Sequence, residues 1–367
     1  MLTTDIPHDG AATPPERCER APVTACPLCR SAGATKLYRT RDALYGGADA
    51  FEVVRCRACG LVYVEDRPSD AALRSYYPSD SYYAYKAPVP YALFESRALS
   101  AQLWYAIKRG VLAWDFGYEH LGGHRWLAAC LRLPFLHWLR RRATFRLDVL
   151  LPRYVENGSL LEVGCGSGMY LALMKALGWK RVVGVDINQE ALERARQTLG
   201  VEVHCGSLPA LKLAAASFDA VSLSHTLEHI GDPVALLTEI HRLLKPGGQL
   251  AIIVPNIDSV SSQAYGVDWF HLDVPRHLVS FDRRTLSAAV NQAGFTIESL
   301  GSSPQSAYIV TLLSLNRRAG IPHSHSVEPR FPATFHARAA LMSLRAWVAC
   351  GLGRTAGEEL LLSAVKP

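Results

Sequence analysis

The sequence predicts an α/β protein with a mostly parallel sheet, and two observations carry that prediction. In the first, an apolar run leads into three alternating glycines over Ser159–Gly168, a helical pattern follows, and a second apolar run ends in Asp186. In the second, strand-like and helix-like stretches continue to alternate as far as about residue 300. Such alternation indicates βαβ units, in which helices connect neighbouring parallel strands.

The glycine spacing after the first strand separates two kinds of nucleotide ligand. A dinucleotide-binding fingerprint starting at Gly164 would need a glycine at position 169, where the chain has Met169. Instead, Glu162 stands two residues before the first glycine. A carboxylate at that point suits a cationic ligand and works against a pyrophosphate. An acid that ends the second strand, here Asp186, is placed to bind a ribose diol.

This Glu-x-Gly-x-Gly-x-Gly pattern resembles the first motif of the class I S-adenosylmethionine-dependent methyltransferases. The Lys-Pro-Gly-Gly turn at 245–248 resembles another segment of the same fold, and the resemblance covers about 150–300 and the last ten residues. It implies a Rossmann-like seven-stranded methyltransferase sheet whose last strand, Glu358–Lys366, is antiparallel. It also implies S-adenosyl-L-methionine as the cofactor, with these binding residues: Glu162, Gly164, Cys165, Gly166, Gly168, Asp186, Ile187, Ser207, Leu208 and Ser224. The family usually has an acid near Ser207, which this chain lacks.

The remaining elements of the core (151–303, with 358–367) follow in order from period and punctuation. The expected strands are Val201–Ser207, Ser217–Ser224, Gln249–Pro255 and Gly294–Leu300, and the expected helices are Gln189–Leu199, Pro233–Leu244 and Thr285–Gln292. Two further helical patterns, Ala307–Arg318 and His336–Cys350, stand before the last strand. We therefore expect residues 304–357 to form a helical cap inserted into the core.

Four of the nine cysteines form two Cys-x-x-Cys pairs, Cys26 with Cys29 and Cys56 with Cys59. The sequence shows no secretion signal, so these pairs favour metal binding in a reducing compartment over disulfides. Two such pairs with a strand-like stretch between them predict a structural four-thiolate Zn²⁺ ribbon over residues 26–74. A redox dithiol and a ribbon that has lost its metal are the alternatives.

Composition places the chain among globular proteins, since 49% of the residues are hydrophobic and 20% are charged. Residues 1–25, rich in Pro, Thr and Glu, predict a flexible tail. No apolar run is long enough to span a bilayer. Together with the absence of a signal pattern, this predicts a cytoplasmic protein.

Residues 75–150 predict a tyrosine-rich linker and a helical insert that is aromatic and basic. Within it, residues 86–150 hold ten Lys or Arg and four Asp or Glu, a difference equal to the whole net charge of +6. The helix expected at 131–149 is either an ordinary docking helix with a basic end or a peripheral membrane contact. Tyr82 and Tyr83 either pin the ribbon to the core or line a substrate pocket.

Methyl transfer to a hydroxyl or a carbon acid needs a base, which must lie beyond the carboxyl ends of the central strands. His225, Glu228 and His229 follow the fourth strand. The string also spells a zinc-peptidase motif, H-x-x-E-H, but its place after a parallel strand argues against that interpretation. It is similar to the Glu-x-x-Glu-His motif that holds a divalent ion in some small-RNA and quinone O-methyltransferases. A third interpretation is that the Glu228–His229 pair caps the next helix and packs on the cofactor loop.

A second set of polar residues follows the fifth strand: Trp269, His271, Arg276 and His277. The segment resembles the Pro-Arg-His-Leu stretch of a bacterial methyltransferase branch that is often fused to zinc ribbons. We expect His277 to be the first choice for the base, ahead of His225. Arg276 would bind an anionic group of the substrate, with Trp269 and His271 beside it. The alternative for His277 is to cap the helix that begins near Asp282.

The sequence thus predicts methyl transfer to a small-molecule acceptor, at oxygen or carbon, of the sugar, glycan-precursor or natural-product type. RNA or DNA is the rival acceptor, but the basic residues of the insert stand among tryptophans and leucines and form no polar basic stripe. A non-catalytic adaptor that binds S-adenosylmethionine is the rival of another class. Met169 and Glu162 exclude a nicotinamide-dependent oxidoreductase.

Overall fold

The computed structural model describes residues 18–77, 85, 99–123, 126, 129, 150–321 and 331–367. Tyr82, Tyr83, the helix expected at 131–149 and most of the expected tail lie outside these residues. The described strands form a seven-stranded sheet, a four-stranded sheet and a two-stranded pair.

The seven-stranded sheet has the strand order β12-β13-β10-β9-β6-β7-β8. Its strands are β6 (Ser159–Val163), β7 (Arg181–Asp186), β8 (Glu202–Cys205), β9 (Phe218–Ser224), β10 (Leu244–Pro255), β12 (Thr296–Ser303) and β13 (Glu359–Val365). The five strands from β10 to β8 are parallel. The last strand, β13, lies antiparallel between β10 and β12. The predicted sheet, with its antiparallel last strand, is therefore confirmed.

Helices cover both faces of this sheet, with α5 (Met169–Ala176) and α6 (Gln189–Leu199) on one side and α7 (Pro233–Leu243) and α9 (Arg283–Gln292) on the other. Successive strand residues point to opposite faces. Leu160 accordingly packs in the core under α5 and α6, whereas its neighbour Leu161 packs in the core under α7 and α9. Two separate cores explain why these strands are continuously apolar.

Aspartate side chains cap the N-termini of α7 and α9. The side chain of Asp232 accepts a hydrogen bond from the backbone of Ala235 and caps α7, and Asp282 forms a reciprocal capping box with Thr285 at α9. The suggested capping of α7 by Glu228–His229, and of α9 by His277, is therefore wrong. His229 and His277 therefore make other contacts, which are described with the candidate site.

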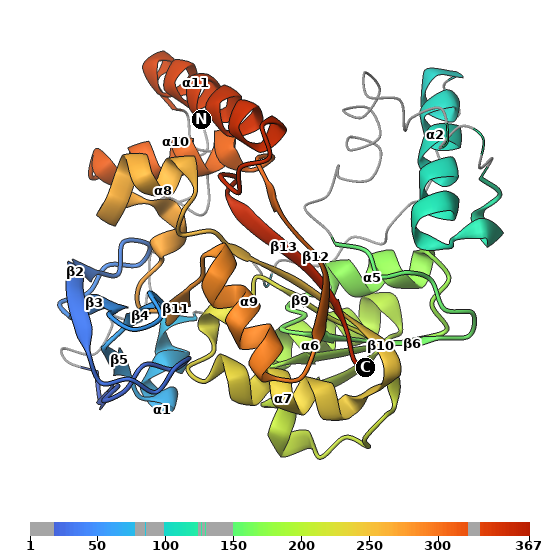
Figure 1. Ribbon diagram of the computed structural model, residues 1–367, viewed down its shortest axis with the longest axis horizontal. Coiled ribbons are helices and arrows are strands. Elements are labelled where there is room, and N and C mark those ends of the chain that lie inside the picture. The colour runs from blue at the N-terminus through green and yellow to red at the C-terminus, as the bar shows by residue number, and fades with distance from the viewer. Residues whose placement is uncertain are drawn as a thin grey trace, which may run out of the picture.

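The ribbon consists of β2 (Ala34–Arg41), β3 (Ala50–Cys56) and β4 (Val62–Val64). A fourth strand, β11 (Val279–Ser280), comes from the core and pairs antiparallel with β4. Next to this sheet, β1 (Arg20–Pro22) pairs with β5 (Asp66–Pro68), and the short helix α1 (Asp70–Leu73) follows. Figure 1 shows the ribbon strands at one end of the molecule, with β11 among them.

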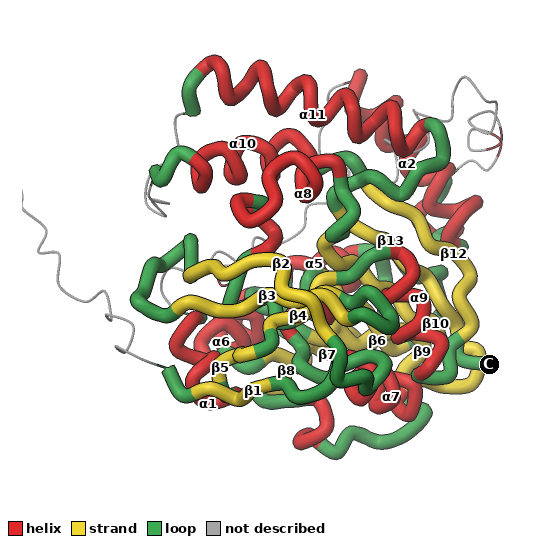
Figure 2. Tube along the Cα trace, turned by 60° about the vertical axis from the view of Figure 1, so that its left-hand side comes forward, coloured by secondary structure: helices red, strands yellow, loops and turns green. Residues whose placement is uncertain are grey.

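Three helices pack against one another: α8 (Val260–Tyr265), α10 (Ala307–Arg318) and α11 (Ala333–Gly351). The last two lie in the segment 304–357 that we expected to form a cap. Figure 2 shows α11 outermost, above α10 and α8. The long helix α2 (Leu99–Phe116) contributes to the core that contains α5 and α6. Single-turn helices lie at Arg74–Tyr76, Glu119–Leu121, Leu208–Leu211, Leu227–His229, Gly266–Asp268 and Phe270–Leu272. Within the described ranges, no helix is both long and apolar enough to cross a bilayer.

Candidate active site and cysteine cluster

The glycine-rich loop between β6 and α5 turns sharply and passes close to the residue that follows β9. Gly164, Gly166 and Gly168 have φ angles of +75°, +50° and +84°, which L side chains rarely adopt. A Cβ added at Gly164 would lie 2.3 Å from Oγ1 of Thr226. The Thr226 hydroxyl donates in turn to the carbonyl of Val163 at 2.9 Å. The predicted cofactor loop is thus locked against the end of β9.

Two carboxylates stand beside this loop, at the ends of neighbouring strands. Glu162 is 4% exposed, and its Oε2 has no hydrogen-bond partner among the described residues. Burial, and then the charge of Asp186, raises the pKa of Glu162 well above its usual value. Asp186 accepts hydrogen bonds from the backbone of Gly166 at 2.8 Å and of Asn188 at 3.0 Å. Because a buried unpaired carboxylate is costly, Glu162 fits a cofactor that brings a cationic donor.

The other predicted cofactor residues surround the same loop. Ile187, directly after Asp186, leaves half of its apolar side chain exposed, and Met169 is 60% exposed. Ser207 is exposed, Ser224 half-buried and Leu208 buried. Cys165 is buried, and burial raises the pKa of its thiol well above the usual value, so it is an inert thiol. Exposed apolar side chains beside an acid are what a bound adenosine would cover.

His225 is the first residue after β9, and its backbone is strained. Its φ of +51° lies in the left-handed region, which is uncommon for a residue other than glycine. Its Nδ1 lies 3.4 Å from Oε1 of Glu228, and its side chain is 32% exposed. Strained residues of this kind concentrate at functional sites. His225 therefore combines an orienting carboxylate with access from outside.

Glu228 is the buried centre of the histidine cluster. It is 1% exposed, and neither oxygen makes a regular hydrogen bond among the described residues. Burial alone would raise its pKa, but the side chains of His225, His229 and His277 lower that pKa to about 2. Glu228 is therefore ionised at neutral pH, with its charge directed at imidazoles.

Two further imidazoles are held by backbone carbonyls. Nδ1 of His277 lies 2.7 Å from the carbonyl oxygen of His271, and Nδ1 of His229 lies 3.0 Å from that of Arg276. A carbonyl can only accept, so each Nδ1 carries a proton. Burial, and then the neighbouring His229, lowers the pKa of His277 to about 4. The neutral ring of His277 thus offers Nε2 as an acceptor in the cluster.

These groups keep the predicted metal-site alternative open. Glu228, His229 and His277 each offer a ligand atom, and the three atoms lie within 4.8 Å of one another. Two imidazole nitrogens and one carboxylate form a donor set that holds divalent transition metals. The carbonyl-anchored Nδ1 atoms match the outer contacts that ligand histidines usually make.

Arg276 is placed differently from its prediction. Its side chain is fully buried and forms ion pairs with Asp42, at 2.7 Å, and with Asp273. Two carboxylates thus neutralise the charge that we expected to bind an anionic substrate group. Trp269 is also fully buried, and its Nε1 lies 3.3 Å from a carboxylate oxygen of Glu358. Arg276 and Trp269 thus hold the segment 269–277 in place, and neither side chain is accessible to an acceptor.

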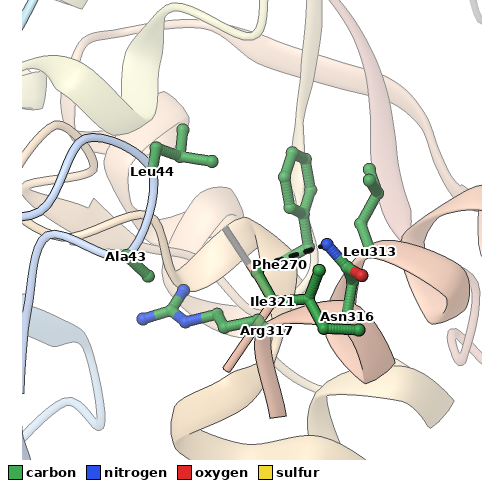
Figure 3. Close-up of a pocket in the computed structure, with 7 residues that line it drawn as sticks. All are labelled: Ala43, Leu44, Phe270, Leu313, Asn316, Arg317 and Ile321. Carbon is green, nitrogen blue, oxygen red and sulfur yellow. Dashed lines mark hydrogen bonds between the residues drawn. The ribbon is translucent and has the colours of Figure 1, made fainter. Parts of the chain in front are cut away.

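His271 lies inside the cluster, with its ring stacked 5.9 Å from that of His225. Burial, and then the neighbouring His225, lowers the pKa of His271 to about 3. Next to it, Phe270 lines a small hollow between the ribbon hairpin and α10 (Figure 3). The hollow is lined by Ala43, Leu44, Phe270, Leu313, Asn316, Arg317 and Ile321, none of which belongs to the histidine cluster.

The four predicted cysteines converge at the tip of the ribbon. Sγ of Cys26 lies 3.5 Å from that of Cys59, as does Sγ of Cys29 from that of Cys56, and all four lie within 4.8 Å. Tetrahedral Zn²⁺ with Zn–S bonds of about 2.3 Å would separate its sulfurs by about 3.8 Å. Burial raises the pKa of Cys56, but the backbone amides of its turn lower it to about 7. The geometry fits a structural Zn²⁺.

Three residues near the site were missed from the sequence. Thr226 packs on Gly164, Tyr77 places its hydroxyl 2.9 Å from Nδ1 of His229, and Asp42 pairs with Arg276. The tyrosine-rich segment pointed to tyrosines in general, but not to Tyr77 as a histidine contact. No local pattern marks Asp42, whose partner is 234 residues away.

The comparison with known families matches this geometry. A family model described as a methyltransferase domain matches residues 135–300. Residues 135–300, less than half of the chain, are therefore similar to the methyltransferase-domain family. The resemblance that the glycine motif predicts is confirmed at the level of the family.

Curated relatives share part of this methyltransferase domain. An uncharacterised 37.1 kDa protein of a transposon from Streptomyces fradiae is 38% identical over 35% of this chain and 37% of its own. A ubiquinone biosynthesis O-methyltransferase from Parvibaculum lavamentivorans is 32% identical over 33% of this chain and 50% of its own. The chain thus spans about half the length, or less, of these relatives. A solved S-adenosylmethionine-dependent methyltransferase from Mesorhizobium loti is 21% identical, with a TM-score of 0.40 over 58% of this chain and 94% of its own.

Proposed function

We propose that the protein transfers a methyl group from S-adenosyl-L-methionine to a small-molecule acceptor. The main support is that the glycine loop and the histidine cluster both lie at the carboxyl ends of the central parallel strands. Glu162 lies in β6 just before the glycine loop, and Asp186 is the last residue of β7. The strained His225 and its partner Glu228 follow β9, which pairs with β6. Ligands of open α/β sheets bind beyond the carboxyl ends of the strands.

The residues divide the work as follows. The bound cofactor would supply a methyl group already activated on a sulfonium. The loop glycines would leave room for it, Glu162 would pair with its amino group, and Asp186 would bind the ribose hydroxyls. The enzyme then has mainly to align the acceptor and exclude water. His225 accepts the acceptor's proton, and the Glu228 carboxylate stabilises the imidazolium that forms.

This assignment changes the first choice of base. His277 was expected to face the acceptor, but it is buried, with its Nδ1 committed to the carbonyl of His271. His225 is the more exposed ring and has Glu228 beside its Nδ1. We assign His225 as the base, and His277 and His229 as the groups that enclose Glu228.

The acceptor proposal rests on the relatives. Several ubiquinone biosynthesis O-methyltransferases, which act in the synthesis of a small molecule, are about 30% identical to this domain over roughly 140 residues. These relatives support an oxygen acceptor on a small molecule. On the sequence resemblance, the proposal extends to carbon acids and to natural products, sugars and glycan precursors. RNA or DNA is the class to test against it.

The decisive experiment has two stages. Titration calorimetry should show S-adenosylhomocysteine binding to the purified protein and none of NAD at the same concentration. Methyl-tritiated S-adenosylmethionine is then incubated with the protein and an extract of its source cells, and the products are separated into organic, aqueous and polymer fractions. Label in a small-molecule fraction supports the proposal, whereas label in nucleic acid overturns the acceptor class. Cofactor binding without label in any fraction would favour a non-catalytic adaptor.

A second candidate concerns how the acceptor loses its proton. The arrangement of Glu228, His229 and His277 favours a divalent cation that would lower the acceptor's pKa. Mn²⁺ titrated into the metal-free domain and followed by electron paramagnetic resonance tests this directly. Saturable binding that His277→Gln abolishes would support a metal-assisted reaction. Full activity after dialysis against a chelator would leave His225 as the base.

We also propose Zn²⁺ in the four-cysteine cluster, as a structural ion closed by four protein ligands. Elemental analysis should find one zinc per chain. The variant Cys56→Ser should lose it, whereas Cys205→Ser, which changes an exposed cysteine outside the cluster, should keep it.

A further inference from the structure

The loop that carries the buried histidines is tied to the ribbon by one ion-pair network. Asp42 follows β2 at the turn of the ribbon hairpin, and its side chain accepts from the backbone of Leu44 at 2.8 Å and of Tyr45 at 3.1 Å. These bonds fix its carboxylate in a tight turn. Each of its two oxygens then lies 2.7 Å from a guanidinium nitrogen of Arg276.

Arg276 passes this restraint directly to the histidine cluster. Its Nε donates to Asp273 at 2.9 Å, inside the same loop. Its own carbonyl oxygen lies 3.0 Å from Nδ1 of His229, and the next residue is His277. The side chain is thus fixed from the ribbon side while the backbone fixes an imidazole on the catalytic side.

The backbone makes a second connection a few residues further on. Leu278 donates its N–H to the carbonyl of Glu228 at 2.8 Å, and its own carbonyl accepts from Val64 of the ribbon at 3.0 Å. Strand β11 then pairs with β4 at the edge of the ribbon sheet. Tyr77, just after the ribbon, adds its hydroxyl contact to His229 at 2.9 Å. The ribbon is therefore linked to the backbone of Glu228 through Leu278, and Tyr77 contacts His229, the residue directly after it.

The ion-pair network is buried, so that the loss of one partner is not compensated by water. Arg276 is fully buried, and the side chain of Asp42 is 2% exposed. Replacing Asp42 by Asn leaves the guanidinium paired with Asp273 alone, and the new amide NH2 faces one of its N–H donors at a buried position that water cannot reach. The loop must then move so that this donor finds another acceptor, and the loop carries His277 and the carbonyl that holds His229.

From this arrangement we propose that the ribbon is a working part of the active site. Asp42 is a positioning residue: through Arg276 it holds His229 and His277 against Glu228, and so keeps the carboxylate that orients His225 in place. The ribbon is thereby more than a separate module for binding a partner. The inference rests on the proposed function for its activity readout, but not for its structural readouts.

The test compares Asp42→Asn with Asp49→Asn in the full-length, zinc-loaded protein. Asp49 is the matched control, because it is also a largely buried ribbon aspartate in an ion pair, with Arg20 at 3.0 Å. It has no contact with the core loop among its described interactions. Three quantities are measured: amide hydrogen exchange over 274–281, the ring ¹⁵N chemical shifts of His229 and His277, and the affinity for S-adenosylhomocysteine.

We expect Asp42→Asn to speed exchange over 274–281 at least tenfold and to change the ring ¹⁵N chemical shifts of His277, because the hydrogen bond from its Nδ1 to the carbonyl of His271 is disturbed. The affinity for S-adenosylhomocysteine should stay within twofold. With an identified acceptor, kcat should fall at least tenfold while KM for the cofactor is unchanged. Asp49→Asn should leave all of these at the wild-type values.

Equal behaviour of the two variants would overturn the proposal. If Asp42→Asn fails to fold, Tyr77→Phe serves in its place, because it removes only the hydroxyl from the ribbon side of His229. Unchanged ring ¹⁵N chemical shifts of His229 in that variant would then count against the proposal. A wild-type protein that binds no S-adenosylhomocysteine would refute the proposed function, whereas the exchange and chemical-shift data would still decide the positioning claim.

Discussion

The two halves of the candidate site are built in opposite ways. The cofactor half comes from one continuous βαβ unit, from Glu162 to Asp186, whose shape follows from its own glycines and strand ends. The histidine half is assembled from the ribbon, the end of β9 and the loop after α8, and it is held by buried ion pairs. Local backbone geometry defines the first half, and long-range charge pairing defines the second. The two halves should therefore fail differently when perturbed.

The largest effect is expected at the base. His225→Gln should lower kcat by about 10²–10⁴-fold, the usual contribution of a general base. The affinity for S-adenosylhomocysteine should not change, because the cofactor half does not depend on the ring. Single-turnover methyl transfer and calorimetry measure the two quantities. The control is His241→Gln, on α7 against Phe295; an equal loss in both variants would remove His225 from the chemistry.

Removing the charge that organises the histidine half should reduce stability more than affinity. Arg276→Met leaves Asp42 and Asp273 buried without their common partner, and we expect a loss of about 3–5 kcal/mol in the free energy of unfolding. Urea denaturation measures it. Arg242→Met, which breaks the exposed pair with Glu239, should cost about 0–1 kcal/mol. Similar values for both variants would show that the buried network does not organise this half.

The cofactor half should respond through backbone strain. At Gly164, an Ala side chain meets Thr226 and an unfavourable φ together, so Gly164→Ala should weaken S-adenosylhomocysteine binding by about tenfold or more. Gly247→Ala is the matched control, since its φ of +73° is similar but nothing lies within 4 Å of its added Cβ. Calorimetry that found equal affinities would contradict the placing of the loop against β9.

The smallest effect is a pH dependence of stability. Burial lowers the pKa of His277 to about 4, so the folded chain keeps this ring neutral while the unfolded chain protonates it below about 6.5. Its contribution is fully present above pH 6.5 and is lost as the pH falls towards 4, by about 1 kcal/mol per pH unit. Glu228, whose pKa is lowered to about 2, changes the free energy of unfolding only at pH values below its ordinary pKa of 4.5.

Denaturation curves at pH 7, 6 and 5 for the wild type and His277→Gln measure this slope. The variant should lose stability less steeply between pH 6.5 and 5. Parallel curves would mean that the ring is not held neutral, and the tight enclosure of Glu228 would then be in doubt.

The same contrast explains how far the sequence could predict this protein. The alternation of strands and helices, the glycine loop and the cysteine cluster were predictable because each depends on residues close in sequence or on a spacing with one dominant use. Arg276 was misassigned because an arginine beside histidines has the same local pattern whether it faces a ligand or a buried aspartate. Its partner Asp42 depends on how two distant segments pack, which no period or motif records. The short strand β11 was missed for the same reason.

Strand β11 also limits how this protein can be engineered. Because β4 finds its neighbour in residues 279–280 of the core, a ribbon transplanted alone from a relative would have an unpaired sheet edge. It would also bring a foreign residue to face Arg276. A working chimaera would have to exchange the ribbon and the segment 273–280 together. The boundary for recombination therefore runs through the interior of the catalytic domain, and not along the junction between ribbon and core.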